Sequence, residues 1–159
     1  MGLTLSRRSL ILALAGAPGV ASATCKPTRV LFVCPAGTVK SAIAREMLRT
    51  RIESERLNLT AASRGLHPED HVSEALAVRL KADGLDTGRE PARPVTARDV
   101  AEADIVVAFD EAAAVPLLRQ ARAWRTPSWN ADYPAAKADL ALRLDALVAE
   151  LRGRREGCR

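Results

Sequence analysis

One segment near the start of the chain constrains the fold more than any other. Residues 29–33 form a short apolar, β-rich run, which predicts a buried strand. This run leads directly into residues 34–41, where Pro35 and Gly37 are typical of a loop. Apolar side chains then recur at helical spacing: Ile43, Met47, Leu48 and Ile52. The segment therefore predicts a strand, a loop and a helix in immediate succession.

The rest of the chain continues this alternation. The predicted elements are a strand over 59–63, a helix marked by Val72, Leu76 and Leu80 that ends at Gly84, a short helix opened by Thr96, a strand over 105–109, a loop over 127–134, a closing helix with an apolar face from Leu140 to Leu151, and a polar, frayed tail from Gly153. Strands that alternate with helices favour an α/β fold with a mainly parallel sheet. Such sheets bind ligands beyond the carboxyl ends of their strands, which is where Cys34 falls.

Length and charge narrow the class of protein. A chain of 159 residues is long enough for one domain with a real core. The formal net charge is +5, but the basic residues are spread along the predicted helices and do not form a dense block with aromatic residues. This pattern is typical of a solvated surface and does not favour a nucleic-acid partner.

The first 23 residues resemble a secretory signal. Arg7 and Arg8 follow Ser6, an apolar stretch runs over 10–17, and small residues stand at 21–23. The paired arginines are typical of a twin-arginine signal. We expect cleavage after Ala23, an exported (periplasmic) single domain over 24–159, and no stable membrane insertion after processing. The alternatives to a signal are a frayed helix or a wrongly chosen start codon, and the alternative location is the cytoplasm.

Cys34 is the leading candidate for chemistry. A cysteine between a buried strand and a helix lies near the positive end of that helix, a position that favours the thiolate. Successive backbone N–H groups of the loop can form a cup for an oxyanion, with Lys40 at its rim. Ser41 offers a hydroxyl to the thiolate. A nucleophile inside an anion cup suits attack on phosphorus. The alternative is a small cysteine that merely packs at the end of a strand.

The segment resembles a known signature. Residues 30–34 followed by five residues, a basic residue and Ser41 look like the loop of the low-molecular-weight protein tyrosine phosphatase family, which is related to thioredoxin-coupled arsenate reductases. Weaker matches follow in order: Ser63-Arg64-Gly65, Leu80 to Asp86, Thr96 with Asp99, Ala103 to Asp110, and Trp129 to Pro134. The resemblance covers about residues 28–152. It implies a three-layer, flavodoxin-like fold with four strands in the order 2-1-3-4.

The resemblance also implies a reaction. Cys34 would attack the phosphorus of a phosphorylated protein or small aryl phosphate, and Asp132 would protonate the leaving oxygen and later activate water. The residues expected to hold the phosphate are Pro35, Ala36, Gly37, Thr38, Val39, Lys40 and Ser41. No metal or other cofactor is expected. Asp110 and Asp139 are rivals of Asp132, which can alternatively be a helix N-cap. Trp129 and Tyr133 either flank the phenyl ring of a substrate or are packing residues of the protein interior.

Three loop positions depart from the family pattern. Lys40 stands where the family has Arg, Gly37 where it usually has Asn, and Val39 where it often has a second cysteine. Lysine lacks the planar fork with which arginine grips two phosphate oxygens. A second hypothesis is therefore a slow or inactive member that binds oxyanions. A third is an arsenate reductase-like redox protein, which the missing second loop cysteine and downstream cysteine pair disfavour.

The remaining cysteines and histidines carry weaker hypotheses. Cys25 and Cys158 lie near the two mature termini and either pair or remain free thiols. His67 and His71 are the only histidines, in a polar loop with too few further ligands for a metal site. The sequence makes no prediction of the oligomeric state or the physiological substrate.

Overall fold

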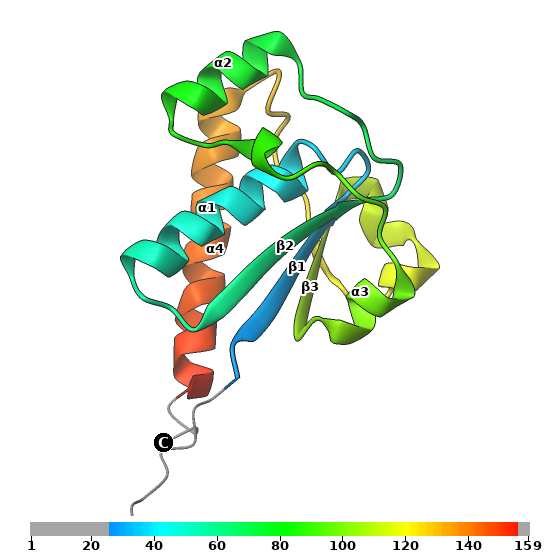
Figure 1. The fold of residues 1–159 in the computed structure, drawn as a ribbon, viewed down its shortest axis with the longest axis vertical. Coiled ribbons are helices and arrows are strands. Elements are labelled where there is room, and N and C mark those ends of the chain that lie inside the picture. The colour runs from blue at the N-terminus through cyan, green and yellow to red at the C-terminus, as the bar shows by residue number, and fades with distance from the viewer. Residues whose placement is uncertain (1–25, 156–159) are drawn as a thin grey trace, which may run out of the picture.

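The computed structural model describes residues 26–155. The predicted signal segment, Cys25 and Cys158 therefore lie outside the described residues. In chain order the elements are β1 (Thr28–Cys34), α1 (Lys40–Ser54), β2 (Leu59–Gly65), α2 (Glu74–Ala82), η1 (Thr87–Arg89), α3 (Ala97–Glu102), β3 (Ile105–Phe109), η2 (Asp110–Ala114), η3 (Pro116–Leu118), β4 (Arg122–Trp124) and α4 (Tyr133–Arg155), where η denotes a 3₁₀ turn (Figure 1).

The four strands form one parallel sheet in the order β2-β1-β3-β4, which confirms the predicted fold class and strand order. In the register of β1 with β2, Cys34 lies opposite Gly65. β1 also pairs with β3, from Val30 opposite Ile105 to Val33 opposite Ala108. β1 is thus a central strand, and its carboxyl end lies at the edge where open parallel sheets bind ligands.

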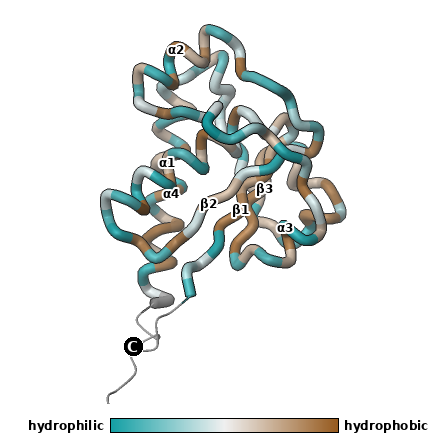
Figure 2. The backbone as a smooth tube through the Cα atoms, in the orientation of Figure 1, coloured by the Kyte–Doolittle hydropathy of each residue, from teal (hydrophilic) through white to brown (hydrophobic). Residues whose placement is uncertain are grey.

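Side chains of β1 alternate between two hydrophobic cores. Val30, Phe32 and Cys34 belong to a core formed mainly with α1, α2 and α4. Leu31 and Val33 face a smaller core formed with η2, η3 and residues of α3. Figure 1 shows α1 and α4 on one side of the sheet and α3 on the other, and Figure 2 shows hydrophobic colour along the central strands. Burial on both faces explains why β1 reads as a continuous apolar run.

The structure corrects several predicted boundaries. Val72 precedes α2, because Ser73 accepts a hydrogen bond from the Leu76 N–H and so begins the helix at Glu74. α4 begins at Tyr133, before Pro134, since proline is tolerated in the first turn of a helix. The same helix continues to Arg155 and so includes part of the predicted tail.

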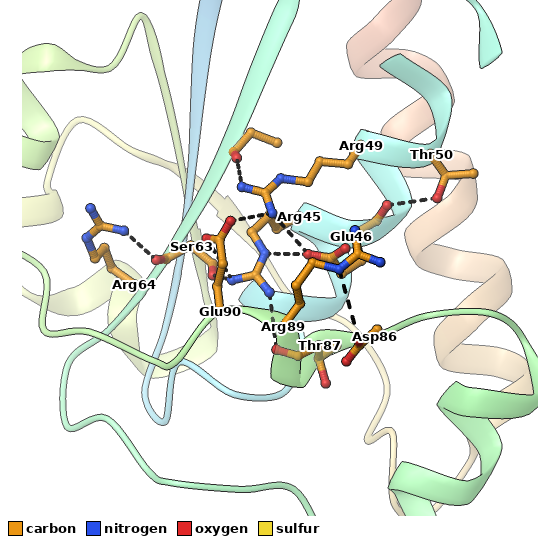
Figure 3. Close-up of polar contacts among 11 residues, drawn as sticks. Arg45, Glu46, Arg49, Thr50, Ser63, Arg64, Asp86, Thr87, Arg89 and Glu90 are labelled. Carbon is orange, nitrogen blue, oxygen red and sulfur yellow. Dashed lines mark hydrogen bonds and ion pairs between the residues drawn. The ribbon is translucent and has the colours of Figure 1, made fainter. Parts of the chain in front are cut away.

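One buried cation ties α1 to the rest of the fold. Arg45 is only 1% exposed. Its Nε lies 2.7 Å from Glu46 Oε1, and its Nη1 lies 2.8 Å from Ser63 Oγ on β2. Figure 3 shows that this guanidinium also reaches the segment that contains Thr87 and Glu90. Arg49 contacts Glu46 and Glu90 as well, so two arginines and two carboxylates form one network.

Within residues 26–155, no helix is both long and apolar enough to span a membrane.

Candidate active site

Cys34 ends β1 and is 2% exposed. Its Sγ lies 3.0 Å from Ser41 Oγ and 3.1 Å from the backbone nitrogen of Gly37, whose N–H donates to the sulfur. The Ser41 hydroxyl also lies 3.2 Å from the carbonyl oxygen of Arg64. Because this hydroxyl carries one hydrogen, it can donate either to that carbonyl or to the sulfur. Donation to the sulfur would place two hydrogen-bond donors, the Ser41 hydroxyl and the Gly37 N–H, beside Sγ.

The N-terminus of α1 is left free for an anion. Val39 occupies the N-cap position without a side-chain cap, and the first turn contains no acidic residue. In the described part of the chain, no protein acceptor is found for the N–H groups of Lys40, Ser41 and Ala42. Unpaired N–H groups at the positive end of a helix are a general anion-binding arrangement. These N–H groups are therefore available to an anion, and the anion cup expected from the sequence stays a prediction.

Two glycines let the loop lie directly against β2. Gly37 has a φ of +74°, and a Cβ built on it would lie 2.9 Å from the Gly65 backbone nitrogen. The carbonyl oxygens of Cys34, Pro35 and Ala36 accept hydrogen bonds from the N–H groups of Leu66, His67 and Glu69. Glycine therefore fits position 37 both in backbone conformation and in space. These contacts fix the cup from the side of β2.

Substituting Gly37 with Ala is expected to lower the free energy of unfolding by about 2–4 kcal/mol, from left-handed backbone strain and a backbone clash. Gly84→Ala is the matched control. Gly84 has a φ of +72°, but its added Cβ would have no neighbour within 4 Å, so only about 1 kcal/mol should be lost. Urea unfolding of both variants measures the difference. Equal losses would contradict the proposed contact between positions 37 and 65.

Lys40 does not point freely over the cup. Its Nζ lies 2.5 Å from Asp110 Oδ2 and 2.9 Å from the carbonyl oxygen of Thr126. Both side chains of the ion pair are mostly buried, at 17% and 23% exposed. A lysine ammonium is a compact point charge on a flexible stem, so it can be held by one partner or another. The cation that the sequence placed at the rim is therefore held by a carboxylate in this structure.

A cavity of about 790 Å³ lies over the cysteine. Its lining residues are Cys34, Pro35, Ala36, Val39, Lys40, Asp110, Glu111, Ala114, Arg125, Thr126, Ser128, Trp129 and Asn130. The cavity thus combines Cys34, the N-terminus of α1 and both members of the Lys40–Asp110 pair. Of the predicted phosphate-binding residues, Gly37 and Thr38 line a neighbouring cavity of about 670 Å³ instead.

Asp132 lies outside the residues that line this cavity. Its side chain is exposed, and Oδ1 accepts a hydrogen bond from the Ala135 N–H at 3.0 Å, which caps the start of α4. Asp139 pairs with Arg143 within α4. The structure therefore brings Cys34, Lys40 and Asp110 together and leaves Asp132 at a helix N-terminus. Its catalytic role stays a prediction.

The two aromatic residues near Asp132 pack against each other. Trp129 and Tyr133 are 1% and 8% exposed, and their rings meet edge to face with centroids 5.3 Å apart. Burial raises the pKa of the Tyr133 phenol, and its hydrogen bond to Asp83 raises it further. Trp129 lines the cavity over Cys34, whereas Tyr133 is not among the lining residues.

Other predicted motifs prove to be structural. Thr96 and Asp99 form a reciprocal capping box at the start of α3, and Asp99 also binds Arg64. His67 and His71 are exposed. Among the described residues, no group of three or more His, Cys, Asp or Glu side chains could hold a metal ion.

A parallel sheet in the order β2-β1-β3-β4, flanked by helices and with a buried cysteine at the end of its first strand, places the chain among flavodoxin-like α/β proteins. A family model described as low molecular weight phosphotyrosine protein phosphatase matches residues 29–141. The chain therefore belongs to this family. No protein of curated function matches the sequence.

Solved structures share the fold. YfkJ from Bacillus subtilis superposes with a TM-score of 0.68 at 19% identity, covering 81% of this chain and 97% of that one. A low molecular weight protein tyrosine phosphatase from T. tengcongensis gives 0.64 at 21% identity, covering 77% and 99%. An arsenate reductase in a phosphate-binding state gives 0.60 at 18% identity, covering 77% and 98%.

Proposed function

We propose that the protein is a phosphomonoester hydrolase of the low-molecular-weight protein tyrosine phosphatase type that works through a phosphocysteine intermediate. The observation that carries this proposal is the environment of the Cys34 sulfur, which faces both Ser41 Oγ and the Gly37 N–H beside an uncapped helix N-terminus. This arrangement supplies hydrogen bonds to a thiolate and free N–H groups to the oxygens of a phosphoryl group.

The reaction follows from these groups. Cys34 Sγ forms a bond to phosphorus, and the bond from phosphorus to the leaving oxygen breaks with its electron pair on that oxygen. The N–H groups of Lys40, Ser41 and Ala42 can hold the equatorial oxygens. Water then attacks phosphorus, the S–P bond breaks, and Ser41 can stabilise the departing thiolate. The leaving oxygen takes up one proton in the first step and the attacking water gives up one in the second, so the products are an alcohol or phenol and inorganic phosphate. The mechanism uses no metal or other cofactor.

Steady-state hydrolysis of p-nitrophenyl phosphate by the full, reduced chain tests this function. We expect turnover that inorganic phosphate inhibits competitively, because product and substrate share the cup. Stabilisation of the protein by phosphate without any turnover would favour the alternative, a family member that binds oxyanions but hydrolyses esters slowly or not at all. If the protein neither hydrolyses the ester nor binds phosphate, both functions are contradicted.

The position of Lys40 is the observation that favours this alternative. Because its ammonium is held by Asp110 and by the Thr126 carbonyl, little positive charge is free for a substrate. Lys40→Arg is expected to raise kcat/KM for p-nitrophenyl phosphate by about 10²-fold, since a guanidinium can bind two phosphate oxygens at once. Lys26→Arg makes the same substitution near the start of the described chain, away from the cavity, and should leave kcat/KM unchanged. An unchanged kcat/KM in the Lys40→Arg variant would show that the cup does not use this side chain in the transition state.

We further propose that residues 1–23 direct export and are removed after Ala23. The support is the order of paired arginines, apolar stretch and small residues. A phosphorylated substrate would then be met outside the cytoplasm. N-terminal sequencing of the protein from the periplasmic fraction tests this route; an intact Met1 confined to the cytoplasm would contradict it.

A further inference from the structure

Asp110 is a carboxylate that the fold brings to the cavity over Cys34. It directly follows β3, the strand beside β1, and opens the 3₁₀ turn η2. Its backbone has a φ of +50°, which non-glycine residues rarely adopt. Such strained positions cluster at functional sites. Asp110 also lines the same cavity as Cys34, whereas Asp132 does not.

The charged groups around Asp110 come from three segments. Lys40 on α1 pairs with it, Glu111 follows it on η2, and Arg125 lies in the segment after β4. All of these residues line the cavity over Cys34. Of these groups, only Lys40 has an ion pair with Asp110 within the described chain. Lys40 is therefore the cationic partner of Asp110 in this structure.

We propose that Asp110 is the acid–base residue of this site, and that substrate binding activates it by drawing Lys40 from the carboxylate to the phosphoryl group. This role rests on the proposed phosphatase function. In the free protein the ion pair holds Lys40 away from the cup. A dianionic phosphoryl group in the cup offers Lys40 a second anionic partner.

The exchange has an electrostatic consequence. A neighbouring cation favours the ionised form of a carboxyl group, and a neighbouring anion favours its protonated form. When Lys40 moves to the phosphoryl group, Asp110 loses the cation and gains an anionic neighbour. It is then expected to take up a proton from solvent. Proton uptake thus occurs when substrate is bound, which is when an acid is needed.

The proton is then used in both steps. As Cys34 Sγ bonds to phosphorus, the Asp110 carboxyl donates its proton to the leaving oxygen, which keeps the electron pair of the broken P–O bond. Asp110 is left as a carboxylate. In the second step it accepts a proton from the water that attacks phosphorus, while the S–P bond breaks and its electron pair returns to sulfur. Asp110 ends the cycle protonated and releases its proton when phosphate leaves and Lys40 returns.

The test compares esters that differ in their need for an acid. Phenyl phosphate releases a strongly basic phenolate, whereas 2,4-dinitrophenyl phosphate releases an ion that needs little protonation. We expect Asp110→Asn to lower kcat/KM about 10²-fold for phenyl phosphate and less than about threefold for the dinitrophenyl ester. Asparagine keeps the fold because it tolerates a positive φ. Circular dichroism of the variant checks that it is folded.

Two matched variants complete the experiment. Glu111→Gln removes the neighbouring carboxylate, and Asp132→Asn removes the rival acid while keeping a side chain that can cap α4. Neither should change the ratio of kcat/KM between the two esters. A leaving-group-dependent loss in Asp132→Asn instead would assign the acid to Asp132 and overturn the proposal. If Asp110→Asn lowers kcat/KM equally for both esters, Asp110 is not the acid and only positions Lys40.

The experiment also distinguishes failure of the phosphatase function from failure of the role of Asp110. The dinitrophenyl ester needs no acid, so its hydrolysis by the unmodified protein reports only the nucleophile and the cup. If the unmodified protein hydrolyses neither ester, the phosphatase function fails and the role of Asp110 fails with it. If it hydrolyses the dinitrophenyl ester but Asp110→Asn has no selective effect on phenyl phosphate, only the role of Asp110 fails.

Discussion

Replacing Cys34 by Ser is expected to lower kcat/KM for p-nitrophenyl phosphate by at least about 10⁴-fold, because a serine hydroxyl cannot replace the thiolate in this cup. In the proposed mechanism the reacting atom is the sulfur that the Gly37 N–H and the Ser41 hydroxyl contact. At neutral pH a serine hydroxyl stays protonated, and no histidine lines the cavity to remove its proton. The variant should therefore keep the anion cup and lose the chemistry.

The other two cysteines provide matched controls for this substitution. Cys25→Ser and Cys158→Ser make the same chemical change elsewhere in the chain and should leave kcat/KM unchanged. The Cys34→Ser variant should still gain thermal stability from inorganic phosphate, because the cup amides are unaltered. Turnover that survives in Cys34→Ser would assign the reaction to a different nucleophile and refute the proposed mechanism.

Replacing Arg45 by Met is expected to lower the free energy of unfolding by about 3–5 kcal/mol, the usual effect of removing one partner from a buried ion pair. The substitution leaves the Glu46 carboxylate, which is only 9% exposed, with Arg49 as its remaining partner. It also removes the hydrogen bonds to Ser63 and to the Thr87 carbonyl. Methionine fills much of the same space, so the loss is mainly electrostatic.

An exposed ion pair is the appropriate comparison. Arg98 pairs with Glu102 at 2.7 Å, but its side chain is 86% exposed. Arg98→Met should therefore change the free energy of unfolding by less than about 1 kcal/mol. Urea unfolding of the two variants gives both values. Similar small losses would show that the Arg45 network contributes little to stability and that its polar groups are readily satisfied in other ways.

Periodicity and turn chemistry predicted most of the fold. The apolar run of β1 was visible because both faces of this central strand are buried. Thr96 was visible because an N-cap has a local signature, which the structure confirms as a capping box. β4 was missed because its three residues, Arg122 to Trp124, carry no apolar run. Its position in the sheet depends on pairing with β3, which a local pattern does not encode.

In the candidate site, only the contacts between residues close together in the sequence could be predicted. Cys34, Gly37 and Ser41 lie within one short stretch from the end of β1 to the first turn of α1, so sequence spacing alone placed them together. The pairing of Lys40 with Asp110 spans 70 positions along the chain and depends on the neighbouring ends of β1 and β3. The contact of Asp132 is local instead, and its hydrogen bond with the Ala135 N–H agrees with the helix N-cap that the sequence offered as an alternative. The burial of Arg45 was not predicted from the sequence, because its partners come from β2 and from the segment after α2.

The central claim is that Cys34 carries the phosphoryl group during turnover. Its most direct test is acid quenching of the protein during hydrolysis of p-nitrophenyl phosphate, followed by mass spectrometry of the tryptic peptide that spans residues 30–40. The mechanism predicts that this peptide carries one added phosphoryl group, located on Cys34 and absent from the Cys34→Ser variant. Sustained turnover in which this peptide never carries a phosphoryl group would contradict the phosphocysteine mechanism.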